Sequence, residues 1–235
     1  MAVPAQRFKR CTALQATCYE EARELTEWLP EAKVAVVPIG IDLPQAISVA
    51  TKATQPLEML FMGRLHPVKG LMNLVEAMNQ LRPEGWSCVL AGPDTDGYQP
   101  ELVAKIKEYR IERWFQFPGE VSGAEKAALY QRASLFVLPS FTENFGVVVP
   151  EALSYCVPVL TTDVTPWNHL SKEGCGWSVP VGASPLADTL KQITEMDSDR
   201  LNQMGRVGRN YVEQAFAWPQ IATQMITLYD EAGNK

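Results

Sequence analysis

From residue 57 onward the sequence alternates strand-like apolar runs with amphipathic runs at helical spacing. The apolar run LEMLFMG (57–63), for example, is followed by VKGLMNLVEAMNQL (68–81), in which apolar residues recur every three or four positions. Each such pair is the pattern of a βα unit, and successive units build a parallel sheet covered by helices. The alternation therefore predicts an α/β fold with a Rossmann-like parallel sheet flanked by helices.

The other elements are expected in the same order. Further strands are predicted at 86–92, 114–119, 134–140, 158–163 and 176–182, and the helices between them at 100–109, 124–133 and 147–156. After the last strand the pattern changes to C-terminal helices at about 185–195, 199–215 and 218–232. The short connections indicate one compact domain.

The first 55 residues differ in character. They read as strand, helix and strand at 12–17, 20–29 and 33–40, followed by a polar stretch at 47–56 that suits a linker. Two strands and one helix are too few to form a core of their own. We therefore expect residues 1–55 to be the remnant of a preceding domain plus a linker, and residues 56–235 to form the main domain.

Composition excludes several classes of protein. The net charge of −6 over 235 residues offers no lysine and arginine excess for a general affinity for nucleic acid. No apolar run of about 18 residues and no signal-peptide pattern is found, so we expect no transmembrane segment and a cytoplasmic location. The five cysteines lack CxxC spacing and are expected to be reduced and buried.

Two loops that follow predicted strands carry suitable chemistry, because parallel sheets bind ligands at the carboxyl ends of their strands. In the first, FMGRLHPVKG (61–70), the cations Arg64 and Lys69 lie beside Gly63 and Gly70. The two cations can clamp a diphosphate from two sides, and the glycines let the backbone approach a ligand closely. The alternative is an ordinary solvated basic loop.

The second loop is FTENFGVVVPEALS (141–154). A helix tolerates Pro150 only in its first turn, so the helix should begin close to Val147 and leave the amides of Val147, Val148 and Val149 without partners inside the helix, where an anion can bind. Glu143 and Glu151 flank this start, and a carboxylate can accept hydrogen bonds from neighbouring hydroxyls of a sugar or ribose. The alternatives are helix-dipole support for Glu151 and a solvated acid for Glu143.

Three further features of the sequence each allow more than one interpretation. The aspartates of GPDTDG (92–97) resemble a metal loop but equally form an Asx turn, and we expect no metal. His66, beside a proline, is expected to be a turn residue. The loop TPWNHL (165–170) follows the fifth predicted strand. Asp163 and Thr165 either have a capping or turn role there or, as the family resemblance given next implies, contact a bound sugar.

Together, these motifs resemble the donor-binding domain of retaining glycosyltransferases of the GT-B fold, family four. The matching segments are GRLHPVKG (63–70), AGP (91–93), FPGEV (117–121), SLFVLPSFTENFGVVVPEAL (134–153) and PVLTTDVTPW (158–167). Glu143 and Glu151 correspond to the family's E-x7-E signature. The similarity extends over about residues 56–235.

The resemblance implies a role for each site residue. Arg64 and Lys69, near Gly63, would bind the donor diphosphate. Glu143 and the backbone of Asn144, Phe145 and Gly146 would hold the sugar, next to the amide of Val147, and Glu151 would bind the ribose hydroxyls. The backbone around Gly119 and Val121 would contact the base. Arg64, Lys69 and Glu143 are the residues expected to act in catalysis, without a metal or other cofactor.

The resemblance also implies the parent activity. A UDP-, GDP- or ADP-sugar would donate its sugar, with retention, to a glycan or glycolipid acceptor in the synthesis of lipopolysaccharide, capsule or another cell-envelope polysaccharide. VAVVPIGID (34–42) is similar to the end of the acceptor-binding domain, with Ile39 in place of the usual asparagine. We therefore expect a fragment that is inactive alone, in a parent that contacts the inner face of the membrane peripherally. The alternative is a noncatalytic nucleotide-binding chain or subunit.

Overall fold

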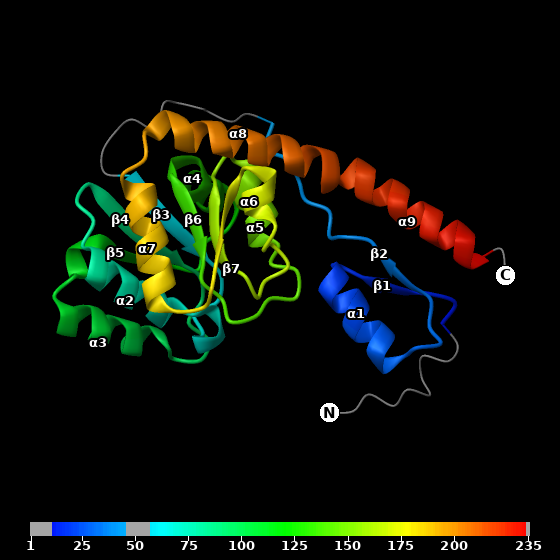
Figure 1. The fold of residues 1–235 in the computed structure, drawn as a ribbon, viewed down its shortest axis with the longest axis horizontal. Coiled ribbons are helices and arrows are strands. Elements are labelled where there is room, and N and C mark those ends of the chain that lie inside the picture. Colours follow the sequence, from blue (N-terminus) through cyan, green and yellow to red (C-terminus); the bar gives the residue numbers. More distant parts are fainter. Residues whose placement is uncertain (1–10, 46–56, 234–235) are drawn as a thin grey trace.

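The structure, a computed structural model, describes residues 11–45 and 57–233 and has the predicted α/β architecture (Figure 1). Its main sheet has six parallel strands in the order β5-β4-β3-β6-β7-β8. The strands are β3 (Leu57–Met62), β4 (Trp86–Ala91), β5 (Phe115–Gly119), β6 (Leu135–Leu138), β7 (Val159–Thr162) and β8 (Gly176–Val179). All six strands predicted from residue 57 onward are confirmed.

Helices connect these strands and cover the sheet. They are α2 (Leu71–Leu81), α3 (Gln99–Tyr109), α4 (Gly123–Arg132), α5 (Val148–Ser154), α6 (Leu170–Glu173), α7 (Ala183–Thr194), α8 (Ser198–Ala215) and α9 (Trp218–Gly233). Helix α2 packs against α3 and α7, whereas α8 packs against α5 and α6. Among the described residues, no helix is both long enough and apolar enough to cross a membrane.

The core explains why these segments adopt their elements. Every residue of β3 and β6 is buried, as expected for strands covered on both faces. Helix α2 buries Leu71, Leu74, Val75 and Met78, the residues at helical spacing.

Three short elements differ from the prediction. The helix expected from residue 68 begins at Leu71, because residues Pro67–Lys69 form a single 3-10 turn (η2) that ends at Gly70. A second 3-10 turn, η3 (Glu112–Trp114), precedes β5, and α6 was not predicted. Such short segments offer too few residues for a periodic pattern.

Residues 11–45 form a small N-terminal unit beside the main sheet. Its parallel strands β1 (Leu14–Ala16) and β2 (Val34–Val36) flank α1 (Tyr19–Trp28), as predicted. Figure 1 shows α9 continuing from α8 past the main sheet and over this unit. A small apolar cluster of Val37, Ile221 and Leu228 joins the unit to α9, so the C-terminal helix supplies the core that the unit lacks. The predicted linker at 47–56 lies outside the described residues.

Candidate functional site

The two loops singled out in the sequence lie next to each other. Strands β3 and β6 are hydrogen-bonded neighbours, and the strand order reverses between them: β4 and β5 continue on one side, β7 and β8 on the other. Such a reversal is the switch point where open α/β sheets bind ligands. The loop at 63–70 follows β3 and the loop at 139–147 follows β6. The prediction that both loops serve one site thus agrees with the topology.

Gly70 ties the two loops together. Its φ of +65° is in the left-handed region, and a Cβ there would lie 2.0 Å from the carbonyl oxygen of Pro139. The amide of Phe141 also donates to the carbonyl of Val68 at 2.9 Å. Gly70 therefore permits close packing of one loop on the other. We had expected it to permit close approach to a ligand, so this part of the prediction is wrong.

Lys69 and Glu143 are in direct contact. Lys69 Nζ lies 2.7 Å from Glu143 Oε1, and Ser140 Oγ donates to the same oxygen at 2.7 Å. The side chains of Lys69 and Glu143 are only 20% and 9% exposed. Two of the three residues expected to act in catalysis therefore form a largely buried ion pair at the switch point. Arg64 is exposed and has no ion-pair partner within the described part of the chain.

Glu151 has two partners that the sequence analysis did not identify. Lys126 Nζ contacts its Oε1 at 2.6 Å, and the Tyr130 hydroxyl donates to its Oε2 at 2.9 Å. Both partners come from α4, four residues apart, and so lie on one face of that helix. The i,i+4 spacing was readable in the sequence, but its contact with α5 was not. Burial, and then the Glu151 charge, raise the pKa of Tyr130 well above its usual value.

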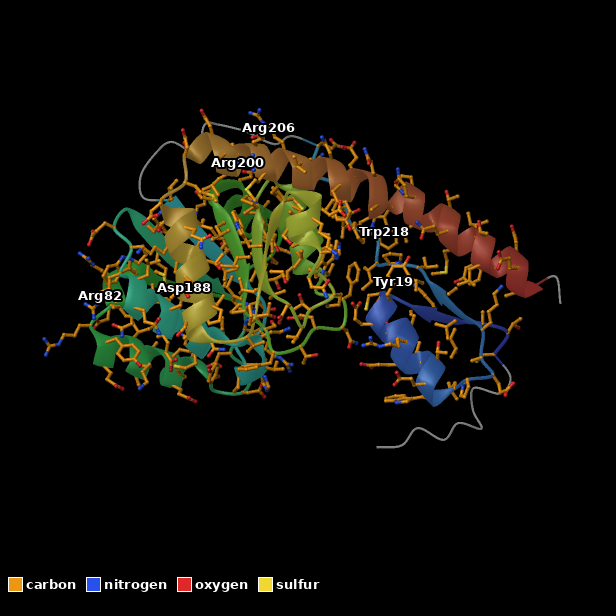
Figure 2. All side chains as sticks on the ribbon, in the orientation of Figure 1. Tyr19, Arg82, Asp188, Arg200, Arg206 and Trp218 are labelled. Atoms are coloured by element: carbon orange, nitrogen blue, oxygen red, sulfur yellow. The ribbon has the colours of Figure 1, made fainter. Side chains whose placement is uncertain are left out.

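A cavity of about 330 Å³ lies between α4 and α5. It is lined by Lys126, Tyr130, Val147 and Glu151, together with residues 40–42 of the N-terminal unit and Trp218 at the start of α9. Figure 2 shows Trp218 at the junction between the main sheet and the N-terminal unit. The residue expected to bind ribose therefore faces a space that residues 40–42 of the N-terminal unit help to line. Gly63, Gly119 and Val121 do not line this cavity, so their roles stay predictions.

The start of α5 agrees with the prediction except at one amide. Val147 is the N-cap residue, and Pro150 lies in the first turn, as expected. The Val149 amide donates at 2.9 Å to the carbonyl of Gly146, which lies outside the helix. It therefore has no partner inside the helix, as predicted, but it is not free to bind an anion. Gly146 adopts a left-handed φ of +73°. The amides of Val147 and Val148 have no hydrogen-bond partner among the described residues.

The loop between Glu143 and Gly146 is held by the core. Phe145 is buried and packs edge-on against Trp167, whose Nε1 donates to the Phe145 carbonyl. The Asn144 carbonyl accepts a hydrogen bond from the thiol of Cys18, at 3.2 Å. Trp167, placed by sequence reasoning in a loop facing the sugar, is therefore a buried support for the loop. Thr165 is likewise buried and bonds the Thr162 carbonyl, in the turn role named as its alternative.

Two other predictions concern turns. His66 is the N-cap of η2, where its Nδ1 accepts from the Val68 amide at 3.1 Å, so the turn role is confirmed. Asp94 Oδ1 accepts from the Tyr98 amide at 2.7 Å, which favours the turn interpretation of GPDTDG. Within residues 11–45 and 57–233 there is no group of three or more His, Cys, Asp and Glu side chains that could hold a metal ion.

Comparison with known proteins decides the family. The model described as "Glycosyl transferases group 1" matches residues 44–211, more than half of the chain. The chain belongs to this family. The chain is 31% identical over 212 residues to WcaL of Salmonella typhimurium, a candidate colanic acid biosynthesis glycosyltransferase, and this match covers 85% of the chain and 51% of that protein. It is 29% identical to the glycogen synthase of Mycobacterium tuberculosis, over 84% of this chain and 48% of that enzyme.

The fold comparison agrees with the family. Sucrose-phosphate synthase from Thermosynechococcus elongatus superposes with a TM-score of 0.85 at 26% identity, over 97% of this chain and 60% of that one. HepE of Anabaena, in complex with UDP and glucose, superposes with a TM-score of 0.83 at 19% identity, over 94% of this chain and 63% of that one. The main domain is therefore the Rossmann-like half of a GT-B fold with its C-terminal helices. The chain spans about half the length of the curated relatives it matches.

Proposed function

We propose that this chain binds a nucleoside diphosphate sugar at the loops 63–70 and 139–147, as the donor-binding part of a retaining hexosyltransferase. The proposed donor is a UDP-, GDP- or ADP-sugar. The acceptor is a glycan or glycolipid of cell-envelope polysaccharide synthesis, such as lipopolysaccharide or capsule. Because the chain spans about half of its relatives, the transfer reaction is proposed for the whole protein, at the inner face of the membrane.

The observation that carries this proposal is the meeting of the two loops at the switch point between β3 and β6. There Lys69 contacts Glu143, and Arg64 lies in the same loop as Lys69. Glu151, in the first turn of α5, lines a cavity. Cations suit a diphosphate and carboxylates suit hydroxyl-bearing rings. Among proteins of this fold, HepE has been solved with UDP-glucose, which supports the same class of donor here.

Arg64, Lys69 and Glu143 have separate roles in the proposed reaction. The bond between the anomeric carbon and the diphosphate oxygen breaks, and negative charge develops on the leaving diphosphate. The acceptor hydroxyl oxygen forms the new bond to the anomeric carbon, and its proton leaves with the diphosphate. Arg64 and Lys69 stabilise that charge electrostatically, so no metal is proposed. Lys69 carries three N–H donors, so it can contact a phosphate while one donor stays on Glu143. Glu143, whose carboxylate is held in place by Lys69 and Ser140, orients the sugar.

Calorimetric titration with UDP, GDP, ADP and their glucose and mannose derivatives tests the binding part. Lys69→Ala and Glu151→Ala should each weaken binding of the preferred nucleotide by about 1–3 kcal/mol, the scale for hydrogen bonds to charged groups. Lys105→Ala, which removes a cation of an exposed ion pair on α3, should bind as the parent does. The assignment is wrong if no nucleotide binds at millimolar concentration, or if both site variants bind like the parent.

Turnover separates the enzyme from the noncatalytic alternative. Both hypotheses predict nucleotide binding by this chain. Only the transferase hypothesis predicts that the whole protein releases nucleoside diphosphate from the preferred donor when a glycolipid acceptor fraction is added. Absence of release with an intact binding site would favour a nucleotide-binding subunit without catalysis.

A further inference from the structure

We propose that Lys126 and Tyr130 are positioning residues that hold the Glu151 carboxylate ready to accept both vicinal hydroxyls of the donor's ribose. This inference rests on the proposed function and adds two residues to it. Neither residue belongs to the motifs found in the sequence. The observation that points to them is the pair of contacts that α4 makes with Glu151.

The contacts are divided between the two carboxylate oxygens. Lys126 donates to Oε1 at 2.6 Å and Tyr130 donates to Oε2 at 2.9 Å. A carboxylate offers about four lone-pair positions, two on each oxygen. One position on each oxygen therefore remains for a ligand. A cis-diol presents two O–H donors on adjacent carbons, and this arrangement matches one acceptor position on each of two neighbouring oxygens.

The surroundings direct those positions toward a ligand. Lys126, Tyr130 and Glu151 all line the cavity of about 330 Å³ between α4 and α5. The Glu151 side chain is 24% exposed and is one of the residues that line that cavity. Val147, beside the loop expected to hold the sugar, lines the same cavity. A ribose on Glu151 would therefore lie close to that loop.

Tyr130 provides a rigid anchor. It is 1% exposed, and its ring stacks on Tyr155 with centroids 5.3 Å apart and packs against Phe136 at 6.0 Å. Because burial raises the pKa of its hydroxyl, Tyr130 remains a donor to Glu151 at all physiological pH values. Lys126 supplies the balancing positive charge from the same face of α4.

A bridge that merely joins α4 to α5 would show the same two contacts, so the test must separate positioning from stability. Both ends of the Lys126–Glu151 pair are partly exposed, and such pairs contribute little to folding. Lys126→Met should therefore fold like the parent. The discriminating property is the preference for a ribose over a deoxyribose, because only a correctly held Glu151 distinguishes the two.

The experiment measures dissociation constants for the tightest binder among UDP, GDP and ADP and for its 2′-deoxy and 3′-deoxy forms. The parent should prefer the ribonucleotide about 10- to 100-fold, the value of one hydrogen bond to a charged group. In Lys126→Met and Tyr130→Phe the preference should fall to about threefold or less, with affinity for the deoxy forms nearly unchanged. Lys126→Arg should restore most of the preference. Lys105→Met is the matched control.

A double variant tests whether Lys126 acts through Glu151. Adding Lys126→Met to Glu151→Gln should weaken ribonucleotide binding no further than Glu151→Gln alone. A further loss would mean that Lys126 contacts the nucleotide directly and would overturn the inference. An equal loss for ribo and deoxy forms, or an unchanged preference, would overturn it too. If the parent binds none of the three nucleotides, the proposed function fails as well.

Discussion

The ion pair between Lys69 and Glu143 leads to a prediction about stability that can be tested without a ligand. Its atoms lie 2.7 Å apart, and the two side chains are 20% and 9% exposed. At an effective dielectric constant of 20, two unit charges at that distance attract by about 6 kcal/mol before desolvation is subtracted. Removing one partner of a well-buried pair typically costs about 3–5 kcal/mol, because the other charge is left uncompensated.

Partial exposure of Lys69 places the expected cost of Lys69→Met at the lower end, about 3 kcal/mol. The methionine retains the packing of the lysine stem, so the loss measures the charge. Glu143→Gln should cost less, since the amide still accepts from Ser140 and leaves a cation with more access to water. The double variant removes both charges. It should be more stable than the sum of the single losses predicts, by a coupling energy of about 2 kcal/mol.

Urea unfolding, followed by the fluorescence of the six tryptophans, measures all four stabilities of this cycle. Lys105→Met with Glu108→Gln on α3 is the matched cycle for an exposed pair, and its coupling should be about 0.5 kcal/mol or less. If the Lys69–Glu143 coupling is no larger than that of the control, the pair is not held together in solution. The reasoning about a preassembled site would then be refuted.

Two further variants test the assembly and the charge of the site. Gly70→Ala should destabilise the fold by more than about 2 kcal/mol and weaken nucleotide binding, since its Cβ would lie 2.0 Å from the Pro139 carbonyl oxygen. Gly97→Ala is the control, because Gly97 has a φ of +71° and a Cβ there would meet nothing within 4 Å. It should lower the free energy of unfolding only by the backbone strain, about 1 kcal/mol. Equal losses of stability in the two variants would disprove the packing argument. Arg64→Ala should weaken nucleoside diphosphate binding about tenfold and reduce its dependence on salt; an unchanged affinity would remove Arg64 from the site.

The strands of the main sheet could be predicted from the sequence because central strands are buried on both faces and are therefore apolar throughout. Runs such as 57–63 are apolar throughout, since both faces of β3 and β6 are covered, and the helices between them show helical spacing. The position of Pro150 likewise located the start of α5. These are local signals, and each is fixed by a residue and its immediate neighbours.

The parts that were missed depend on contacts between distant segments. Lys126 and Tyr130 reach Glu151 only because α4 and α5 lie beside each other, across a separation of 21–25 residues. Trp167 appeared to be a loop residue, yet it is 1% exposed because it fills the space behind Phe145. Close approach at Gly70 was expected of a ligand, and the backbone of Pro139 occupies that place. No periodicity within one segment encodes such pairings.

Both signature acids are paired with lysines, and this pairing determines the charge of the site. Glu143 pairs with Lys69 from the loop after β3, and Glu151 pairs with Lys126 from α4. These four charges sum to zero, so the net positive charge among the five side chains comes from Arg64. In the proposed function, a diphosphate is therefore attracted by Arg64 and by sharing the donors of Lys69 with Glu143. Because Lys69 contacts Glu143, the acid proposed to bind the sugar, the proposed phosphate contact and the proposed orientation of the sugar depend on one side chain.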